Sequence, residues 1–170
     1  VFEYIDHISS KISGSRDNVK KLHQLKDYAF ENADFIIASS RQLASEAIRQ
    51  VGDQKVLYIP NGVDVNHYRN KKYQKIKLAD NLLRFRNRFD IIVGYFGAIS
   101  PWLWYRMLTK LTQMRDDIGF VFIGPDYQNS LAHLPKTPNT LHLNAVNYKY
   151  LPGYAQTFDV CFIPFAPGKI

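Results

Sequence analysis

The chain has 170 residues, of which 46% are hydrophobic and 22% are charged, and this composition excludes a disordered, fibrous or low-complexity protein. Its longest uncharged apolar stretch, residues 91–99, is far shorter than the roughly 20 residues that span a bilayer, so we expect no transmembrane segment. The single cysteine, Cys161, excludes an internal disulfide and a CxxC zinc site, and this cysteine usage favours the cytosol.

In the first 59 residues, short apolar segments alternate with helical patterns. Strands are expected at residues 1–5, 35–38 and 55–59, and helices at 19–29 and 43–51. The first helix is predicted to bury an apolar stripe that consists of Val19, Leu22, Leu25 and Ala29. The second is predicted to start with a capping box of Ser39 and Gln42 and to stop at Gly52. This order of elements is typical of a parallel α/β sheet.

The same alternation resumes after residue 89. Strands are expected at residues 91–96, 119–123, 140–143 and 159–164, with a short helix at 151–158. Another helix is predicted to have Ser100 as its N-cap and Pro101 as its first residue, and to bury Trp104. Cys161, in the last strand, is expected to have a packing role. We therefore predict an α/β fold with Rossmann-type parallel sheets and helices on both faces.

A basic segment separates these two regions. Eight lysines and arginines between Arg69 and Arg88 are opposed only by Asp80 and Asp90, so this stretch carries six of the seven net positive charges. We interpret residues 65–89 as a linker or peripheral segment with one short helix. Its charge fits either a solvated surface or peripheral contact with an anionic membrane. Nucleic acid is not expected as a partner, because no recognition module accompanies the charge.

The most specific string is Ile59-Pro-Asn-Gly-Val-Asp64. Asn61 and Gly62 are predicted to supply positive φ angles for a sharp turn, and Asp64 to accept hydrogen bonds from free N–H groups beyond it. Further strings occur in a fixed order at residues 33–40, 94–97, 120–125, 148–154 and 158–165. In that order they resemble the family-4 (group 1) glycosyltransferases of the bacterial surface-polysaccharide type, enzymes with the GT-B fold that use a nucleotide-sugar donor.

The resemblance implies a division of the chain into parts of two domains. Residues 1–64 correspond to the second half of the acceptor-side Rossmann-like domain, residues 65–89 to the linker, and residues 90–170 to the first half of the donor-binding domain. The expected hinge residues are Asn61, Gly62 and Asp64. The resemblance therefore implies an incomplete GT-B arrangement, and we expect the chain to be one segment of a longer enzyme.

The resemblance also implies a donor site. The expected donor-binding residues are Gly97, Ala98, Ser100, Arg106 and Gly124. The donor diphosphate would lie over the turn that begins at Gly97, where backbone N–H groups can face negative oxygens, although Gly97 could equally serve close packing alone. Ala98 stands where many relatives have arginine, so Arg106 and Lys110 are the available substitutes.

Asp6 and His7 are the expected catalytic residues. They follow the first strand, at the level where relatives have a residue near the transferred sugar and where open α/β sheets bind ligands. The alternative is an ordinary solvated loop. Because the five histidines show no ligand spacing, no metal site is expected, and no cofactor is expected either.

Together these features predict transfer of a sugar from a UDP- or GDP-linked donor to a glycan or lipid-linked acceptor in surface polysaccharide biosynthesis. The resemblance alone implies retention of configuration and independence from metal ions. The cysteine usage and the basic segment add the expectation of a cytoplasmic location, with peripheral contact at the inner membrane surface as one interpretation of the charge. Two alternatives remain open. In the first alternative, the chain is a nucleotide-binding α/β module without transferase activity. In the second, it is a basic fragment that docks on a membrane or a partner chain.

Overall fold

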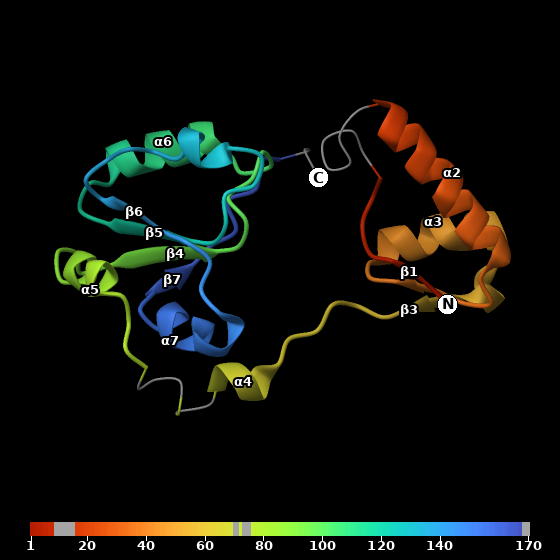
Figure 1. Ribbon diagram of the computed structural model, residues 1–170, viewed down its shortest axis with the longest axis horizontal. Coiled ribbons are helices and arrows are strands. Elements are labelled where there is room, and N and C mark those ends of the chain that lie inside the picture. The colour runs from red at the N-terminus through yellow and green to blue at the C-terminus, as the bar shows by residue number, and fades with distance from the viewer. Residues whose placement is uncertain (9–15, 70–71, 73–75, 168–170) are drawn as a thin grey trace. The chain divides into compact units, whose positions relative to one another are not determined.

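The computed structural model describes all residues except 9–15, 70–71, 73–75 and 168–170 (Figure 1). The chain divides into two compact units, Val1–Val63 and Asp64–Ile170, which we call the first and second units. Each contains its own parallel sheet and its own hydrophobic core. Within the described part of the chain, no helix is long and apolar enough to cross a membrane.

The first unit has a three-stranded parallel sheet in the order β1-β2-β3. The strands are β1 (Phe2–Tyr4), β2 (Ile36–Ala38) and β3 (Val56–Tyr58), and the helices are α2 (Arg16–Asn32) and α3 (Arg41–Val51). Phe30 of α2 and Leu43 of α3 belong to one core cluster with Tyr4 and Ile36, so both helices cover the same face of the sheet. Right-handed crossovers between neighbouring parallel strands give this arrangement.

The start of α3 differs by one residue from the prediction. Ser40, not Ser39, is the N-cap, and its Oγ accepts a hydrogen bond from the Leu43 N–H at 3.2 Å. The Ser39 hydroxyl instead donates to the Ile5 carbonyl at 2.9 Å and so joins the loops that follow β1 and β2. Gly52 ends the helix with φ of +85°, as predicted.

The second unit has a four-stranded parallel sheet in the order β6-β5-β4-β7. Its strands are β4 (Ile92–Phe96), β5 (Gly119–Ile123), β6 (Thr140–Leu143) and β7 (Val160–Cys161). Its helices are α4 (Val65–Arg69), α5 (Asp80–Arg86), α6 (Tyr105–Met114) and α7 (Leu151–Ala155). Single 3₁₀ turns are described at Asp53–Lys55 in the first unit and at Ser130–His133 and Tyr148–Tyr150 in the second.

Helices cover both faces of this second sheet. Leu108 of α6 packs with Phe120 and Phe122 on one face. On the other face, Leu82 of α5 packs with Val121, and α7 lies against the same cluster. All five residues of β5 are buried between these layers. The predicted α/β class with parallel Rossmann-type sheets is therefore confirmed.

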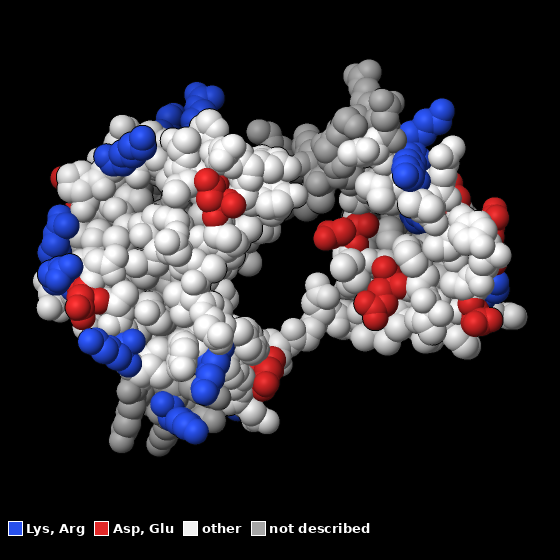
Figure 2. Space-filling model, viewed as in Figure 1, with Lys and Arg blue, Asp and Glu red and all other residues white. Residues whose placement is uncertain are grey.

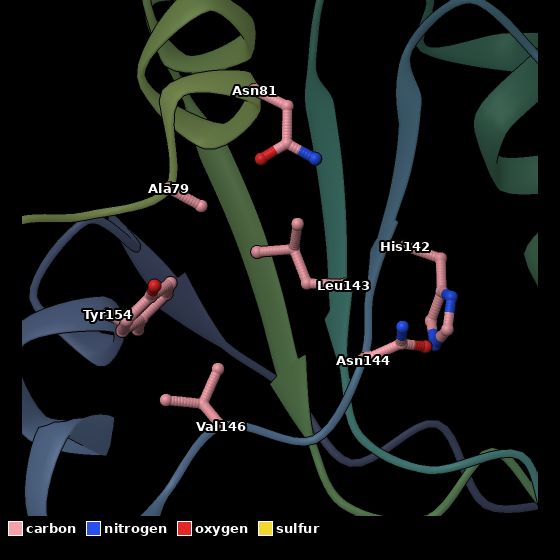
Figure 3. A pocket seen from close by; sticks show the side chains of 7 residues that line it. All are labelled: Ala79, Asn81, His142, Leu143, Asn144, Val146 and Tyr154. Atoms are coloured by element: carbon pink, nitrogen blue, oxygen red, sulfur yellow. The ribbon is translucent and has the colours of Figure 1, made fainter.

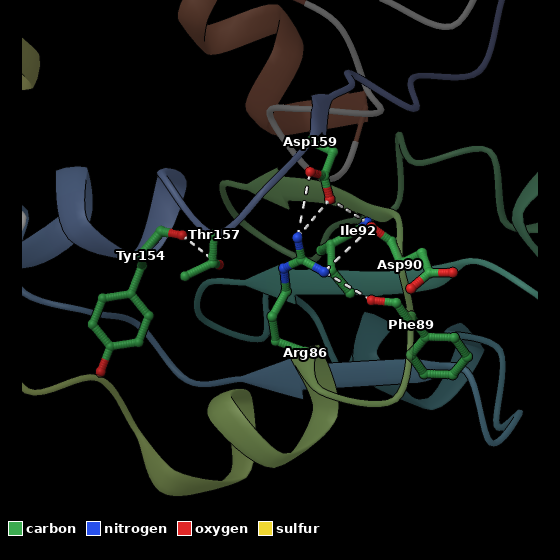
Figure 4. A network of polar contacts seen from close by, with 7 residues as sticks. All are labelled: Arg86, Phe89, Asp90, Ile92, Tyr154, Thr157 and Asp159. Carbon is green, nitrogen blue, oxygen red and sulfur yellow. Dashed lines mark hydrogen bonds and ion pairs between the residues drawn. The ribbon is translucent and has the colours of Figure 1, made fainter.

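Helix α5 makes the basic segment part of the second unit's core. Leu82 and Phe85 are buried, so this portion of residues 65–89 is not a loose linker. Arg86 donates to the Phe89 carbonyl at 2.7 Å and pairs with Asp159 at 3.4 Å (Figure 4). The Asp159 carboxylate also accepts from the Ile92 N–H at 2.7 Å. Arg86, one of the eight lysines and arginines of the basic segment, thus joins α5 to β4 and β7.

Helix α6 starts later than predicted, at Tyr105 instead of Pro101. The reason is a pairing with a distant segment: the Trp104 N–H donates to Pro164 at 2.8 Å, and Leu103 forms an antiparallel bridge with Phe165. Residues held in this way cannot join a helix. The prediction that Trp104 is buried is also wrong, because its side chain is 40% exposed.

Two further local predictions fail, at the Asn61–Gly62 turn and at Cys161. Asn61 and Gly62 lie in an irregular segment without positive φ, so the sharp turn is absent. The role predicted for Asp64 is confirmed, since its carboxylate accepts from the His67 N–H at 2.9 Å at the start of α4. Cys161 is exposed and not packed, because β7 is a two-residue strand at the edge of the sheet.

Candidate functional site

Two glycine turns meet at the carboxyl edge of the second sheet. Gly97 follows β4 with φ of +155°, and Gly124 follows β5 with φ of +156°. A Cβ atom on Gly124 would overlap the Gly97 carbonyl, and one on Gly97 would collide with the Tyr95 hydroxyl. The two turns therefore touch backbone to backbone, in a conformation that only glycine adopts without strain.

Hydrogen bonds fix these turns in place. The Gly97 N–H donates to Ile123 at 2.9 Å, and the Gly124 N–H donates to Leu143 at 3.0 Å. The Tyr95 hydroxyl donates to the Ala98 carbonyl at 3.1 Å. The ends of β4, β5 and β6 thus form one preorganised edge, and open α/β sheets bind ligands at such an edge.

A pocket of about 360 Å³ opens beside the end of β6 (Figure 3). Its lining residues come from the α5 region, the end of β6 with the loop beyond it, and α7: Ala79, Asn81, His142, Leu143, Asn144, Val146 and Tyr154. His142 Nε2 lies 3.0 Å from the Gly124 carbonyl, so the pocket adjoins the glycine turns. Its amide, imidazole and phenol groups can hydrogen-bond a neutral polar ligand. The sequence contains one signal for this pocket: the polar residues His142 and Asn144 flank Leu143, the last residue of β6.

The expected donor-binding residues fall into two groups. Gly97, Ala98 and Gly124 come together at the carboxyl edge. Ser100 is fully buried nearby, and its Oγ has no hydrogen-bond partner among the residues described. Arg106 lies on α6, where it lines an apolar groove of about 400 Å³ with Trp104, Met107, Lys110, Leu111 and Met114. The Ser100 to Trp102 stretch is not a helix N-terminus, because α6 starts at Tyr105.

An aromatic cluster stands next to the Gly97 turn. The His67 and Tyr148 rings stack with centroids 4.4 Å apart, and His67 Nε2 lies 2.9 Å from the Tyr148 carbonyl. Tyr68 stacks on Phe96, the last residue of β4, at 6.4 Å. Burial, with a smaller contribution from Tyr148, raises the pKa of Tyr68. Helix α4 is thereby held close to the end of β4.

A cluster of ionisable residues occupies the carboxyl end of β1 in the first unit. Lys26 Nζ lies 2.9 Å from one Glu46 oxygen, and His7 Nδ1 lies 3.4 Å from the other. Burial raises the pKa of Tyr4 far above its usual range, and a hydrogen bond to Glu46 adds to this effect. Burial also opposes ionisation of Glu46, but hydrogen bonds from Lys26 and Tyr4 outweigh it and lower the pKa of this carboxyl.

Of the two expected catalytic residues, only His7 joins this cluster. Asp6 is exposed in the loop after β1. Sequence reasoning missed Lys26 and Glu46, although the sequence held a signal: Glu46 stands beside Ala47 on the apolar face of α3. Among the described residues, no group of three or more His, Cys, Asp and Glu side chains could hold a metal ion. The hinge role of Asn61, Gly62 and Asp64 stays a prediction.

No protein-family model matches the chain. A similar protein of Bacillus subtilis, named "Putative teichuronic acid biosynthesis glycosyltransferase TuaH", is 27% identical over 162 residues, which cover 92% of this chain and 39% of TuaH. Solved structures of HepE from Anabaena have a similar fold. The complexes with UDP and glucose and with UDP-glucose each give a TM-score of 0.63 at 21% identity, and the UDP complex gives 0.59 at 22%. Each covers 94% of this chain and 45% of HepE, so the chain spans less than half the length of the proteins it matches.

Proposed function

We propose that this chain is part of a glycosyltransferase that uses a nucleotide-sugar donor in the synthesis of a surface polysaccharide. The observation that carries the proposal is the alignment with TuaH, which extends over 92% of the chain and through both units. The HepE structures contain UDP or UDP-glucose, which favours a UDP-linked donor over a GDP-linked one. The narrower assignment to family 4 rests on the ordered sequence strings alone.

In this proposal the second unit binds the donor. The Gly97 and Ile99 N–H groups already donate to the Ile123 and Pro125 carbonyls, so the Ala98 N–H between them is the group of this turn that would face a diphosphate. The neutral pocket formed by Asn81, His142 and Asn144 can hydrogen-bond the uncharged part of the nucleotide. A polar pocket next to a glycine turn suits a ligand with one anionic part and one neutral part.

The remaining parts of the proposal rest on the family resemblance. We propose transfer with retention of configuration and without a metal ion, to a glycan or a lipid-linked acceptor, on the cytoplasmic side of the membrane. The first unit would contribute His7 to the acceptor side. Exposed cations of α5 and its C-terminal end, Arg84 and Arg88, would provide peripheral contact with anionic headgroups.

Calorimetric titration of the purified chain with UDP and GDP tests the donor site. UDP is expected to bind more tightly than GDP, and Asn144→Ala to weaken UDP binding by about tenfold, the cost of one lost hydrogen bond. Gln113→Ala, an exposed change on α6, is the matched control and should bind UDP as the parent does. If neither nucleotide binds, the donor-site assignment is wrong. Binding without transfer by the longer protein would favour the non-catalytic module.

A further inference from the structure

Helix α6 has apolar side chains on two sides. On the inner side, Leu108 packs with Phe120 and Phe122 against the second sheet. The other side faces outward, because α6 is the outer layer over this face of the sheet (Figure 1). It carries the apolar groove of about 400 Å³, which we call the α6 groove. All its lining residues belong to α6 or to the N-cap, so no other described element of the chain closes it.

The apolar residues of the α6 groove are spaced like the seam of a helix pair. They are Trp104, Met107, Leu111 and Met114, at intervals of three, four and three residues. This is the a/d spacing of a heptad repeat, and it puts the side chains in one narrow line about 15 Å long. The ends of the line are open, since Trp104 is 40% and Met114 79% exposed. So narrow a line fits a second helix, whereas helices on membrane surfaces present a broad apolar face.

The charge of the α6 groove indicates what the second helix carries. Arg106 and Lys110 also line the groove, and α6 contains no acidic residue. Neither cation forms an ion pair with another residue in the described part of the chain. Charges beside an a/d seam select the partner helix by opposite sign. A second copy of α6 would bring cations against cations, so an acidic helix is favoured over a symmetric dimer.

The composition of the α6 groove favours a helix from a separate protein. Tryptophan, methionine and arginine are enriched at interfaces between proteins, whereas unpaired charges are almost never buried in the seams of a protein core. Both methionines of the sequence and one of its two tryptophans lie in this groove, together with Arg106 and Lys110. Methionine side chains also adapt readily to a docking surface.

We propose that the α6 groove is the docking site for an acidic amphipathic helix of a partner protein. The apolar stripe of the partner would pack along the four apolar residues of the groove, and its Asp or Glu side chains would face Arg106 and Lys110. This is the helix-in-groove mode of recognition. Because the seam is only about three helical turns long, the complex should be weak and transient. The docking site does not depend on the donor site.

The two methionines make the α6 groove directly observable. Met107 and Met114 are the only methionines of the sequence, so an NMR spectrum of the whole chain with carbon-13 in the methionine methyl groups reports on this groove alone. The probe is a synthetic three-heptad peptide with Leu at a and d and Glu at e and g, whose own charges keep it monomeric. It is expected to shift both methyl signals. A matched peptide with Lys at e and g is expected to leave them in place.

Two exposed positions of the groove separate the apolar and the charged contributions. Met114→Gln is expected to weaken binding of the acidic peptide about tenfold, because it removes an apolar contact. Lys110→Glu reverses one charge and is expected to weaken binding about fivefold. The controls Leu83→Gln and Lys136→Glu make equivalent changes at exposed positions outside the groove and should bind as the parent does.

Several outcomes would overturn the proposal. They are methyl signals that the acidic peptide leaves unmoved, equal binding of the acidic and basic peptides, or groove variants that bind as their controls do. Methyl shifts on dilution of the chain alone would assign the groove to a second copy. Shifts caused by phosphatidylglycerol vesicles at physiological salt would assign it to a membrane surface. If the longer protein fails to bind the peptide that this chain binds, a segment of that protein covers the groove.

Discussion

Lys26 shows how one side chain can change the buried face of a helix. The periodicity of α2 predicts that Leu22 and Leu25 face the core. Instead they are 36% and 53% exposed, whereas Lys26 and Phe30 are buried. The cation is tolerated there because it lies over an aromatic ring and pairs with Glu46. The sequence could not reveal this, since the partner carboxylate comes from a different helix.

The lowered pKa of Glu46 makes a prediction about acid stability. A carboxyl whose folded-state pKa is lowered adds stability above its unfolded pKa, about 4.3, and that stability is lost as the pH falls through the folded value. Glu46→Gln should therefore be less stable than the parent at pH 7, and the difference should shrink on acidification. Urea unfolding of both proteins at a series of pH values measures this difference in the free energy of unfolding. A difference that stays constant with pH would contradict the prediction, and Glu31→Gln provides the baseline.

The glycine turns support a second prediction at this scale. A methyl group on Gly124 would overlap the Gly97 carbonyl and require a strained φ, so Gly124→Ala should lower the free energy of unfolding by about 1–3 kcal/mol. Gly62→Ala is the matched control, because a methyl group there meets no atom within 4 Å and φ is not strained. Its effect should stay within about 0.5 kcal/mol. If Gly124→Ala and Gly62→Ala lowered the free energy of unfolding equally in urea, the two glycine turns would not meet as described.

At the scale of elements, the strands were predictable and the junctions were not. Runs such as residues 119–123 are apolar throughout because both faces of a central parallel strand are covered, and this pattern can be read directly. The start of α6 could not be predicted in this way, because it depends on a backbone hydrogen bond from Trp104 to Pro164, which lies far along the chain. The pocket in Figure 3 could be read from the sequence only in part, since Asn81 and Asn144 line it together only because α5 packs beside β6.

Two adjacent leucines test whether α5 belongs to the second unit. Leu82 is fully buried in the cluster with Val121, and Leu83 is 43% exposed. Leu82→Ala should therefore cost about 2–5 kcal/mol, and Leu83→Ala less than about 1 kcal/mol. Both tryptophans, Trp102 and Trp104, lie in the second unit, so tryptophan fluorescence during urea unfolding follows that unit. If the two variants unfold alike, α5 is a peripheral segment after all.

At the scale of the whole molecule, the net charge of +7 is the dominant electrostatic property. Figure 2 shows the Lys and Arg side chains of the second unit spread around its surface, without one continuous patch on this face. Arg86 is already paired with Asp159, so the free charge of α5 and its end is smaller than the sequence indicates. Any attraction to an anionic surface should therefore come from several separate, solvated cations and should be weak.

Vesicle sedimentation measures this attraction. Exposed cations interact over about 30 Å at 0.01 M salt but only about 8 Å at 0.15 M, so the chain should sediment with anionic vesicles at low salt and be released near physiological salt. Arg84→Gln/Arg88→Gln should weaken binding more than Arg41→Gln/Arg49→Gln, a control in the first unit that removes the same charge from exposed positions. Equal losses would mean that net charge alone drives adsorption. A selective loss would assign membrane contact to the basic segment, because the number of charges removed is the same in both variants.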